Sequence, residues 1–372
     1  MLKILFILAF SEQIFAAVLR SYSSNGNFNI FLTAPIINNT RTKIEVKTVR
    51  PYNASRLYTS YHLSDGSTII PLVTISDMDI NSRDLLHEST WISTSLRGYV
   101  FFNTRNNIYK IVWLAQHNYT YELGYQNRGM ELSDLKVFDG NLLSPGDKTG
   151  VIYKLRNNYV VPWVINADGD GEHSKPFKAE WMTIKNEELY VGGYGKEFTD
   201  QRGNFMDNNP MYIKIISRFG EIRSESWVER LTRLRSSIGI EFPNYIIHES
   251  CQWSDIHRKW FFLPRKVAFE PFDNRTEGMR GSNYLITADE NFLKFDHVFV
   301  GKKHITRGFS AFQFLPETND TLIVALKSEE VDGLSLATYS MIFGIDGTVY
   351  MDETKLPGNF KMEGLEFVDW NG

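Results

Sequence analysis

The amino-acid sequence predicts an all-β fold, on three observations. Short runs rich in β-branched and aromatic residues recur along the 372-residue chain. Turns built from Gly, Asn and Asp, such as Asp139-Gly140, Asp332-Gly333 and Asp346-Gly347, separate these runs. No linker rich in Pro, Gly or Ser divides them. Many short strands within one domain are typical of a β-propeller or a β-sandwich, and an internal repeat would distinguish the two.

The first 17 residues resemble a secretory signal peptide or a short signal anchor. Lys3 precedes an apolar run from Ile4 to Phe10, and the small pair Ala16 and Ala17 follows. The run is shorter than the roughly 20 apolar residues that cross a bilayer, so no transmembrane domain is expected. Five acceptor sequons agree with a glycosylating compartment. They begin at Asn38, Asn53, Asn118, Asn274 and Asn319.

We expect an N-terminal extension over residues 18–40 and a single β domain over residues 41–372. Ten runs in this domain are predicted as strands: 69–75, 98–103, 108–113, 151–155, 159–165, 188–192, 212–216, 259–263, 321–326 and 339–345. With 42% hydrophobic and 14% aromatic residues, the chain can bury a large core. The net charge of -4 comes from mixed acids and bases without a long basic block, so a nucleic-acid partner is not expected.

One segment has a helical pattern. Ser224 can cap a helix from Glu225 to Ser237, in which Trp227, Leu231 and Leu234 share one face. We interpret this helix as packed over an edge of the sheets. The alternative is a face that binds a partner or a second copy, which would make a homodimer possible.

A repeat favours the propeller. Four stretches begin with a small or acidic oxygen-bearing residue in an apolar setting and place a charged residue, 14 to 17 positions later, at the end of the following strand. The pairs are Ser133 with Asp147, Glu180 with Lys196, Glu249 with Arg265, and Ser310 with Lys327. A fifth starter, Glu363, lies near the C-terminus, and the N-terminal run that ends in Asp77 can supply its missing strand. Five units closed by the two ends of the chain predict a five-bladed β-propeller.

The repeat also predicts a chemistry. Starters on the innermost strands would face one another around a central channel as three carboxylates and two hydroxyls. This all-oxygen set suits Ca²⁺, and a ring of buried carboxylates without a cation would be costly. The alternative is a set of isolated buried polar residues satisfied by the backbone. The second positions would meet at one mouth of the channel, where mixed carboxylates and cations suit phosphate chemistry unless they are solvated loop charges.

The remaining sequence features do not predict a further functional site. Asp168-Gly-Asp-Gly171 resembles the start of a Ca²⁺-binding EF-hand loop, but Ala179 stands where the twelfth-position Glu belongs, so a tight acidic turn is the better interpretation. Cys251 is the only cysteine and is interpreted as a small buried residue. The sequence has no P-loop and no HExxH zinc motif.

From roughly Leu72 to Val368 the chain resembles the soluble calcium-activated nucleotidases, the apyrase family shared by vertebrate Golgi and ER enzymes and some salivary apyrases of blood-feeding arthropods. The matching segments include Arg128-Gly-Met-Glu-Leu-Ser-Asp134, Asp147-Lys-Thr-Gly150, Lys178-Ala-Glu-Trp181, Tyr190-Val-Gly-Gly193, Ile247-His-Glu-Ser250, Trp260-Phe-Phe-Leu-Pro-Arg265, Gly308-Phe-Ser310 and Ile323-Val-Ala-Leu-Lys-Ser-Glu-Glu330. They occur in order over about four-fifths of the chain.

The resemblance implies a five-bladed propeller with one Ca²⁺ in its channel. It implies hydrolysis of the terminal phosphate of nucleoside diphosphates, UDP and GDP in preference to ADP, and of some triphosphates. It also implies residence in the ER or Golgi lumen or secretion, with clearance of UDP left by glycosylation as the role. The alternative is a catalytically silent, secreted propeller that binds Ca²⁺.

The resemblance assigns site residues position by position. The implied calcium ligands are Ser133, Glu180, Glu249, Ser310 and Glu363, with Asp134 beside the first. The implied catalytic acids, which would position an attacking water, are Asp77 and Asp147. The implied substrate-binding residues are Lys196, Glu197, Arg265 and Lys327. Phe198 stands where relatives carry Trp, so stacking of a base there would be weaker.

Overall fold

The computed structural model describes residues 5–10, 14–22, 28–33, 50–331 and 334–369. The chain divides into two compact units, Met1–Asn53 and Ala54–Gly372. In the first unit, β1 (Leu5–Phe10), β2 (Ile14–Tyr22) and β3 (Phe28–Thr33) form an antiparallel sheet in that order. The assignments of residues 1–17 as a signal and 18–40 as an extension remain predictions, and their residues 1–4, 11–13, 23–27 and 34–40 lie outside the described residues.

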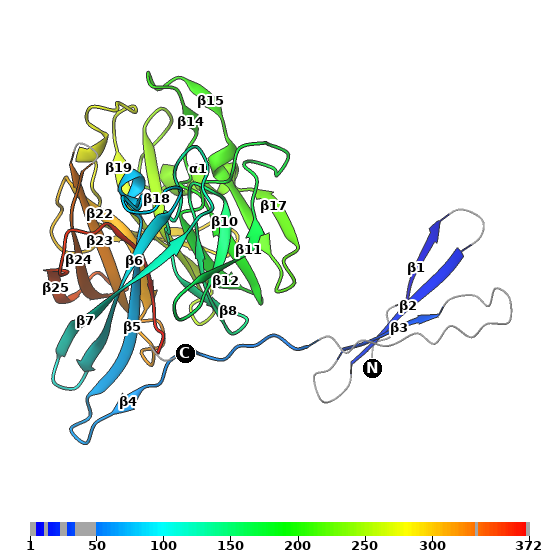
Figure 1. Ribbon diagram of the computed structural model, residues 1–372, viewed down its shortest axis with the longest axis horizontal. Helices are drawn as coiled ribbons and strands as arrows, with labels where there is room; N and C mark the ends of the chain where they lie inside the picture. The colour runs from blue at the N-terminus through cyan, green and yellow to red at the C-terminus, as the bar shows by residue number, and fades with distance from the viewer. Residues whose placement is uncertain (1–4, 11–13, 23–27, 34–49, 332–333, 370–372) are drawn as a thin grey trace. The chain divides into compact units, whose positions relative to one another are not determined.

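The second unit is a five-bladed β-propeller (Figure 1). Blade 1 contains β8 (Lys136–Phe138), β9 (Asn141–Pro145), β10 (Val151–Leu155) and β11 (Val160–Ile165). Blade 2 contains β12 (Trp181–Lys185), β13 (Glu188–Gly192), β16 (Tyr212–Ile216) and β17 (Ile222–Ser226). Blade 3 contains β18 (Tyr245–Ser254), β19 (Lys259–Ala268), β20 (Tyr284–Asp289) and β21 (Phe295–Phe299).

Blade 4 contains β22 (Arg307–Phe314), β23 (Leu322–Val331), β24 (Leu334–Gly344) and β25 (Val349–Lys355). Blade 5 contains β26 (Met362–Glu366), β5 (Thr68–Ser76), β6 (Trp91–Asn103) and β7 (Ile108–Tyr121), and the short β4 (Tyr61–His62) also pairs with β5. A separate hairpin of β14 (Phe198–Thr199) and β15 (Phe205–Asp207) extends beyond the blades (Figure 1). Single-turn 3₁₀ helices lie at Asp79–Ser82, Asn209–Met211 and Glu277–Met279.

The ring closes as the repeat predicted. Each innermost strand, β8, β12, β18, β22 and β26, contacts the next around the ring. The C-terminal β26 pairs antiparallel with β5, so that Met362 faces Ser76 and Glu366 faces Val73. The two ends of the domain therefore share blade 5, which confirms both the blade number and the closure.

The predicted strands are all present, with several longer than expected. β10, β13 and β16 have the predicted bounds, whereas β19 continues to Ala268 and β23 to Val331. Arg265 and Lys327 therefore lie inside strands, and the expectation that they end them is wrong. Ladder pairing continues past both residues: Lys266 pairs with Ile247, and Lys327 pairs with both Phe309 and Tyr339.

The helix, α1, runs from Val228 to Ser236 and begins three residues later than predicted. Ser224 does not cap it, because residues 222–226 form β17, where the Ser224 hydroxyl accepts a hydrogen bond from Lys214 Nζ at 2.8 Å. Trp227, Leu231 and Leu234 are buried, as expected for the inward face. They join a core cluster with residues of blades 2 and 3, which confirms that the helix packs against the sheets. None of the helices within the described residues is long and apolar enough to cross a membrane.

β-Bulges set the side-chain direction of two of the predicted starters, Ser310 and Glu363. On β22, Phe309 and Ala311 pair with successive residues of β23, so Ser310 is the extra residue of a bulge. Glu363 is the extra residue between Met362 and Gly364 on β26 in the same way. Bulges redirect a side chain and are common beside functional sites. The sheets thus turn these two residues out of the regular ladder.

Candidate functional site

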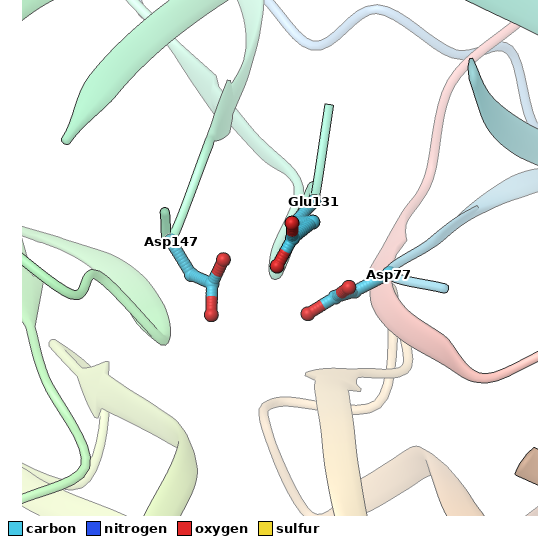
Figure 2. A group of neighbouring side chains, drawn as sticks. All are labelled: Asp77, Glu131 and Asp147. Atoms are coloured by element: carbon cyan, nitrogen blue, oxygen red, sulfur yellow. The ribbon is translucent and has the colours of Figure 1, made fainter. Parts of the chain in front are cut away.

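Three acidic side chains converge where blades 5 and 1 meet. Asp77 directly follows β5, Glu131 precedes blade 1, and Asp147 lies two residues after β9. One carboxylate oxygen of each lies within 4.8 Å of the others, and Figure 2 shows the three groups turned toward one space. The residues are 1%, 0% and 3% exposed, respectively. We call them the acid cluster; its oxygens could hold a metal ion.

Burial governs the protonation of the acid cluster. Loss of water, together with the charge of Asp147, raises the pKa of Asp77 to about 6 and that of Glu131 to about 8. Arg128 opposes this effect, since its Nε donates to Glu131 Oε1 at 2.8 Å and its Nη2 contacts Glu131 Oε2 and Asp79 Oδ1. Negative charge is therefore concentrated here and only partly balanced.

Asp147 has one bound and one free oxygen. Its Oδ2 accepts a hydrogen bond from Lys178 Nζ, and the same ammonium lies 2.5 Å from Glu180 Oε1. Burial alone would lower the pKa of Lys178, but the two carboxylates outweigh it and raise that pKa well above its usual range. Oδ1 of Asp147 is buried and has no hydrogen-bond partner among the described residues. Asp147 thus keeps an acceptor for a ligand.

Lys361 forms a second bridge out of the acid cluster. Its ammonium lies 2.7 Å from Asp79 Oδ2, 3.5 Å from Asp77 Oδ2 and 3.3 Å from Glu363 Oε1. Lys361 therefore joins the mouth of the propeller to an inner strand, as Lys178 does on the other side.

The structure brings the three predicted carboxylate ligands of the inner strands close together. Nη1 of Arg265 contacts both Glu249 and Glu363, the latter at 2.7 Å, and Nη2 lies 2.8 Å from Glu330. Burial raises the pKa of Glu180 to about 8, with Glu249 adding to the effect, and raises the pKa of Glu363 well above its usual range. Together these three form the inner carboxylates: Glu180, Glu249 and Glu363. Arg265 and the two lysines provide their positive partners.

The two predicted serine ligands, Ser133 and Ser310, are also buried. Ser310 Oγ donates to Met362 O at 2.7 Å and accepts from Ser328 Oγ at 3.0 Å. Ser133 Oγ lies 3.5 Å from Glu131 O. Asp134 differs from them, because its Oδ1 accepts from Leu135 N at 2.7 Å and its Oδ2 from Met182 N at 2.6 Å. Both oxygens of Asp134 therefore accept backbone hydrogen bonds, and the one from Met182 joins blade 1 to blade 2.

The remaining predicted substrate residues have other partners. Lys196 Nζ donates to Glu197 O at 3.0 Å and lies over the rings of Tyr194, Tyr245 and Phe272. The Glu197 carboxylate forms a bidentate, buried pair with Arg235 at 2.6 and 2.7 Å.

Lys327 is also bound elsewhere. Its Nζ is buried against Glu353 Oε1 at 2.8 Å, over the Phe309 ring. Within the described residues, no hydrogen bond or ion pair joins Lys196, Glu197 or Lys327 to the acid cluster.

A basic pocket adjoins the acid cluster. Its volume is about 160 Å³, and its lining contains four cationic side chains with Asp147 at one wall. The lining residues are Tyr125, Gln126, Arg128, Asp147, Lys148, Lys175, Pro176 and Lys178. Lys175 also lies over the Phe198 ring, at 4.9 Å, which connects the pocket to an aromatic side chain that is 40% exposed. Such a pocket suits a group with several phosphate oxygens.

The comparisons with known proteins agree on one family. The family model described as Apyrase matches residues 78–368. The chain belongs to the apyrase family. It is 40% identical to soluble calcium-activated nucleotidase 1 of Rattus norvegicus over 90% of this chain and 82% of that protein. It is 40% identical to Apyrase apy-1 of Caenorhabditis elegans, over 85% and 89%, and 41% identical to an apyrase of Cimex lectularius, over 79% and 81%.

In this apyrase-family chain, sequence reasoning missed Glu131, Lys178 and Lys361. Each lies two positions before a predicted starter, namely Ser133, Glu180 and Glu363. Lys178 and Lys361 lie beside their starters, at 2.5 Å from Glu180 Oε1 and 3.3 Å from Glu363 Oε1, while Ser133 contacts the backbone oxygen of Glu131. The signal was therefore present in the repeat. Arg128 and the basic pocket have no comparable signal, because they depend on how loops of different blades meet.

Proposed function

We propose that this apyrase-family protein is a Ca²⁺-dependent nucleotidase that releases the terminal phosphate of nucleoside diphosphates, UDP and GDP in preference to ADP, and of some triphosphates. The observation that carries the proposal is the buried acid cluster beside a pocket lined by four cations. Acids that can handle a water and cations that can hold phosphates are what phosphoanhydride hydrolysis requires. The names of the relatives, calcium-activated nucleotidase and apyrase, support the same reaction.

We assign Ca²⁺ to the inner carboxylates Glu180, Glu249 and Glu363, together with Ser133 and Ser310. Their chemistry fits the ion, because all five offer oxygen. Glu180 and Glu363 are buried with raised pKa values, and the Glu249 side chain is only 13% exposed. Bound Ca²⁺ would add two positive charges to those of Arg265, Lys178 and Lys361, which already pair with these carboxylates. Asp134 is left out of the set because backbone amides occupy both of its oxygens.

We place the phosphates in the basic pocket, against Arg128, Lys148, Lys175 and Lys178. We give Arg265 an indirect role, since its guanidinium is buried among Glu249, Glu330 and Glu363. Lys196, Glu197 and Lys327 have partners elsewhere, so we assign them no phosphate contact in this arrangement. A base extending from the pocket would stack on Phe198, whose ring already carries Lys175.

The reaction would be a direct displacement by water. The water oxygen attacks the terminal phosphorus, the bond from phosphorus to the bridging oxygen breaks, and the nucleoside monophosphate leaves with that oxygen. Asp147 Oδ1, the free acceptor, can orient the water. Asp77, whose pKa burial raises to about 6, can take its proton near neutral pH.

The predicted signal supports the compartment, and the family resemblance alone supports the cellular role. We infer residence in the ER or Golgi lumen, or secretion, where the protein would clear UDP released by glycosylation. The alternative function is a catalytically silent propeller that binds Ca²⁺ and a ligand.

The test is phosphate release from UDP, GDP, ADP and ATP by the purified protein with Ca²⁺, Mg²⁺ or EGTA. Asp147→Asn should lower kcat at least ~100-fold, because it removes the acceptor for the water. Asp296→Asn, at a carboxylate that is 78% exposed, is the matched control and should leave kcat unchanged. A folded, Ca²⁺-loaded protein that releases phosphate from none of the four nucleotides would support the silent propeller.

A further inference from the structure

The charges around the channel do not balance. Eight carboxylates are linked by ion pairs to only four cations within the described residues. The carboxylates are Asp77, Asp79, Glu131, Asp147, Glu180, Glu249, Glu330 and Glu363, and the cations are Arg128, Lys178, Arg265 and Lys361. Four negative charges are in excess when all eight acids are ionised. One Ca²⁺ at the inner carboxylates would cancel only two of them.

The acid cluster is the part of this network to which no cation has yet been assigned. Asp77, Glu131 and Asp147 are each at least 97% buried, so water screens them poorly. Oδ1 of Asp147 is buried without any partner in the described part of the chain, and it is an acceptor that ordinary folding would satisfy. The convergence of the three groups in Figure 2 places this free acceptor beside the other two acids.

The spacing of the acid cluster fits a hard divalent cation. Three oxygens that lie no more than 4.8 Å apart can all lie within about 2.8 Å of one point, close to the 2.3–2.6 Å of a Ca²⁺–oxygen bond. Three protein oxygens leave about three to five of the 6–8 positions around Ca²⁺ for other ligands. The basic pocket shares Asp147, so phosphate oxygens bound there would be the nearest candidates.

We propose that Asp77, Glu131 and Asp147 bind a second divalent cation, separate from Ca²⁺ at the inner carboxylates, and that this cation binds the phosphates of the nucleotide. The second half of the statement rests on the proposed function; the cation site itself does not. Binding is weak in the free protein, because Arg128 and Lys178 repel the ion. It tightens when the phosphates of the nucleotide supply further oxygens.

Ca²⁺ stoichiometry tests the site without turnover. Isothermal titration of the full-length protein with Ca²⁺, with and without a methylene-bridged UDP analogue that cannot be hydrolysed, should give two Ca²⁺ per chain with the analogue. Glu131→Gln should weaken the second ion at least 100-fold and keep the first. Glu249→Gln should do the reverse, since Glu249 contacts Arg265 at the inner carboxylates and not the acid cluster. Asp79→Asn, at a neighbouring carboxylate that is 38% exposed, should keep both ions.

A single Ca²⁺ per chain in the presence of the analogue would overturn the proposal, as would two ions in Glu131→Gln. If Glu131→Gln fails to fold, as judged by circular dichroism, Asp147→Asn serves in its place. Two ions without phosphate release would refute the proposed function and leave the second site standing. Phosphate release with one bound ion would refute the second site and support the proposed function.

Discussion

Arg265 is the positive partner of the inner carboxylates, so its removal should destabilise the metal-free protein strongly. Arg265→Met keeps much of the side-chain volume but leaves Glu249 and Glu363 without the guanidinium that contacts both. Removing one partner of a buried ion pair costs about 3–5 kcal/mol. The expected loss is of this size because Arg265 is only 3% exposed.

The size of the domain converts this energy into a temperature. The unit Ala54–Gly372 has 319 residues. At roughly 2.1 cal/mol/K per residue, its unfolding entropy is about 670 cal/mol/K, so 3–5 kcal/mol lowers Tm by about 4–7 °C. Arg258→Met is the matched control. Arg258 also pairs with acids, at 2.6 Å from Glu290, but its side chain is 54% exposed, and the loss should stay below about 1 kcal/mol.

Scanning calorimetry of the wild type and both variants, in EGTA and in Ca²⁺, measures the effect. Ca²⁺ should reduce the difference in Tm between Arg265→Met and the wild type, because the ion replaces the missing positive charge. The difference for Arg258→Met should be the same in both conditions. If Arg265→Met lowers Tm by the same amount in EGTA and in Ca²⁺, the assignment of Ca²⁺ to these carboxylates is refuted. A loss of Tm no larger than that of Arg258→Met would refute the role of Arg265 as the positive partner of the inner carboxylates.

Three further predictions concern stability. Gly308→Ala should lower Tm by about 2–4 °C, since a Cβ would lie 2.0 Å from the Arg265 carbonyl oxygen; an unchanged Tm would count against this close packing. Arg235→Met should cost about 3–5 kcal/mol in urea unfolding by stranding the buried Glu197 carboxylate, and adding Glu197→Gln should recover part of the loss; no recovery would contradict the pairing. Burial lowers the pKa of Lys214 to about 8, so between pH 8 and 10.5 the unfolded chain binds more protons than the folded one. The wild type should gain stability over Lys214→Met across that window, and parallel urea midpoints for the two proteins would contradict this.

The sequence predicted the blades because a propeller repeats one local unit. Runs of β-branched and aromatic residues, turn residues between the runs, and the repeated spacing of oxygen-bearing starters and charged residues are all local or periodic signals. The helix start was misplaced by three residues because Ser224 is a good cap residue. Residues 222–226 instead complete blade 2, which is a tertiary preference that the local pattern does not contain.

The site was predicted unevenly for a related reason. Asp77 and Asp147 could be placed together because each follows the second strand of its repeat unit. The partners of Glu197 and Lys327 could not be predicted, because Arg235 and Glu353 lie far away in sequence and reach them only after the blades fold. The roles of all these residues remain predictions.

The layer of residues two positions before the starters explains why the candidate site lies to one side of the channel. In blades 1, 2 and 5 that position holds Glu131, Lys178 and Lys361, whose charges extend the inner carboxylates toward the mouth.

In blades 3 and 4 the same position holds Ile247 and Gly308, which bring no charge. A side chain at Gly308 would collide with Arg265, because a Cβ there would lie 2.7 Å from Arg265 Cγ. The absence of a side chain thus makes room for Arg265 to contact Glu249 and Glu363 from this side. In the adjoining blades 5, 1 and 2 the charged residues at this position lie at the acid cluster and the basic pocket: Glu131 belongs to the cluster, Lys178 lines the pocket, and Lys361 pairs with Asp77.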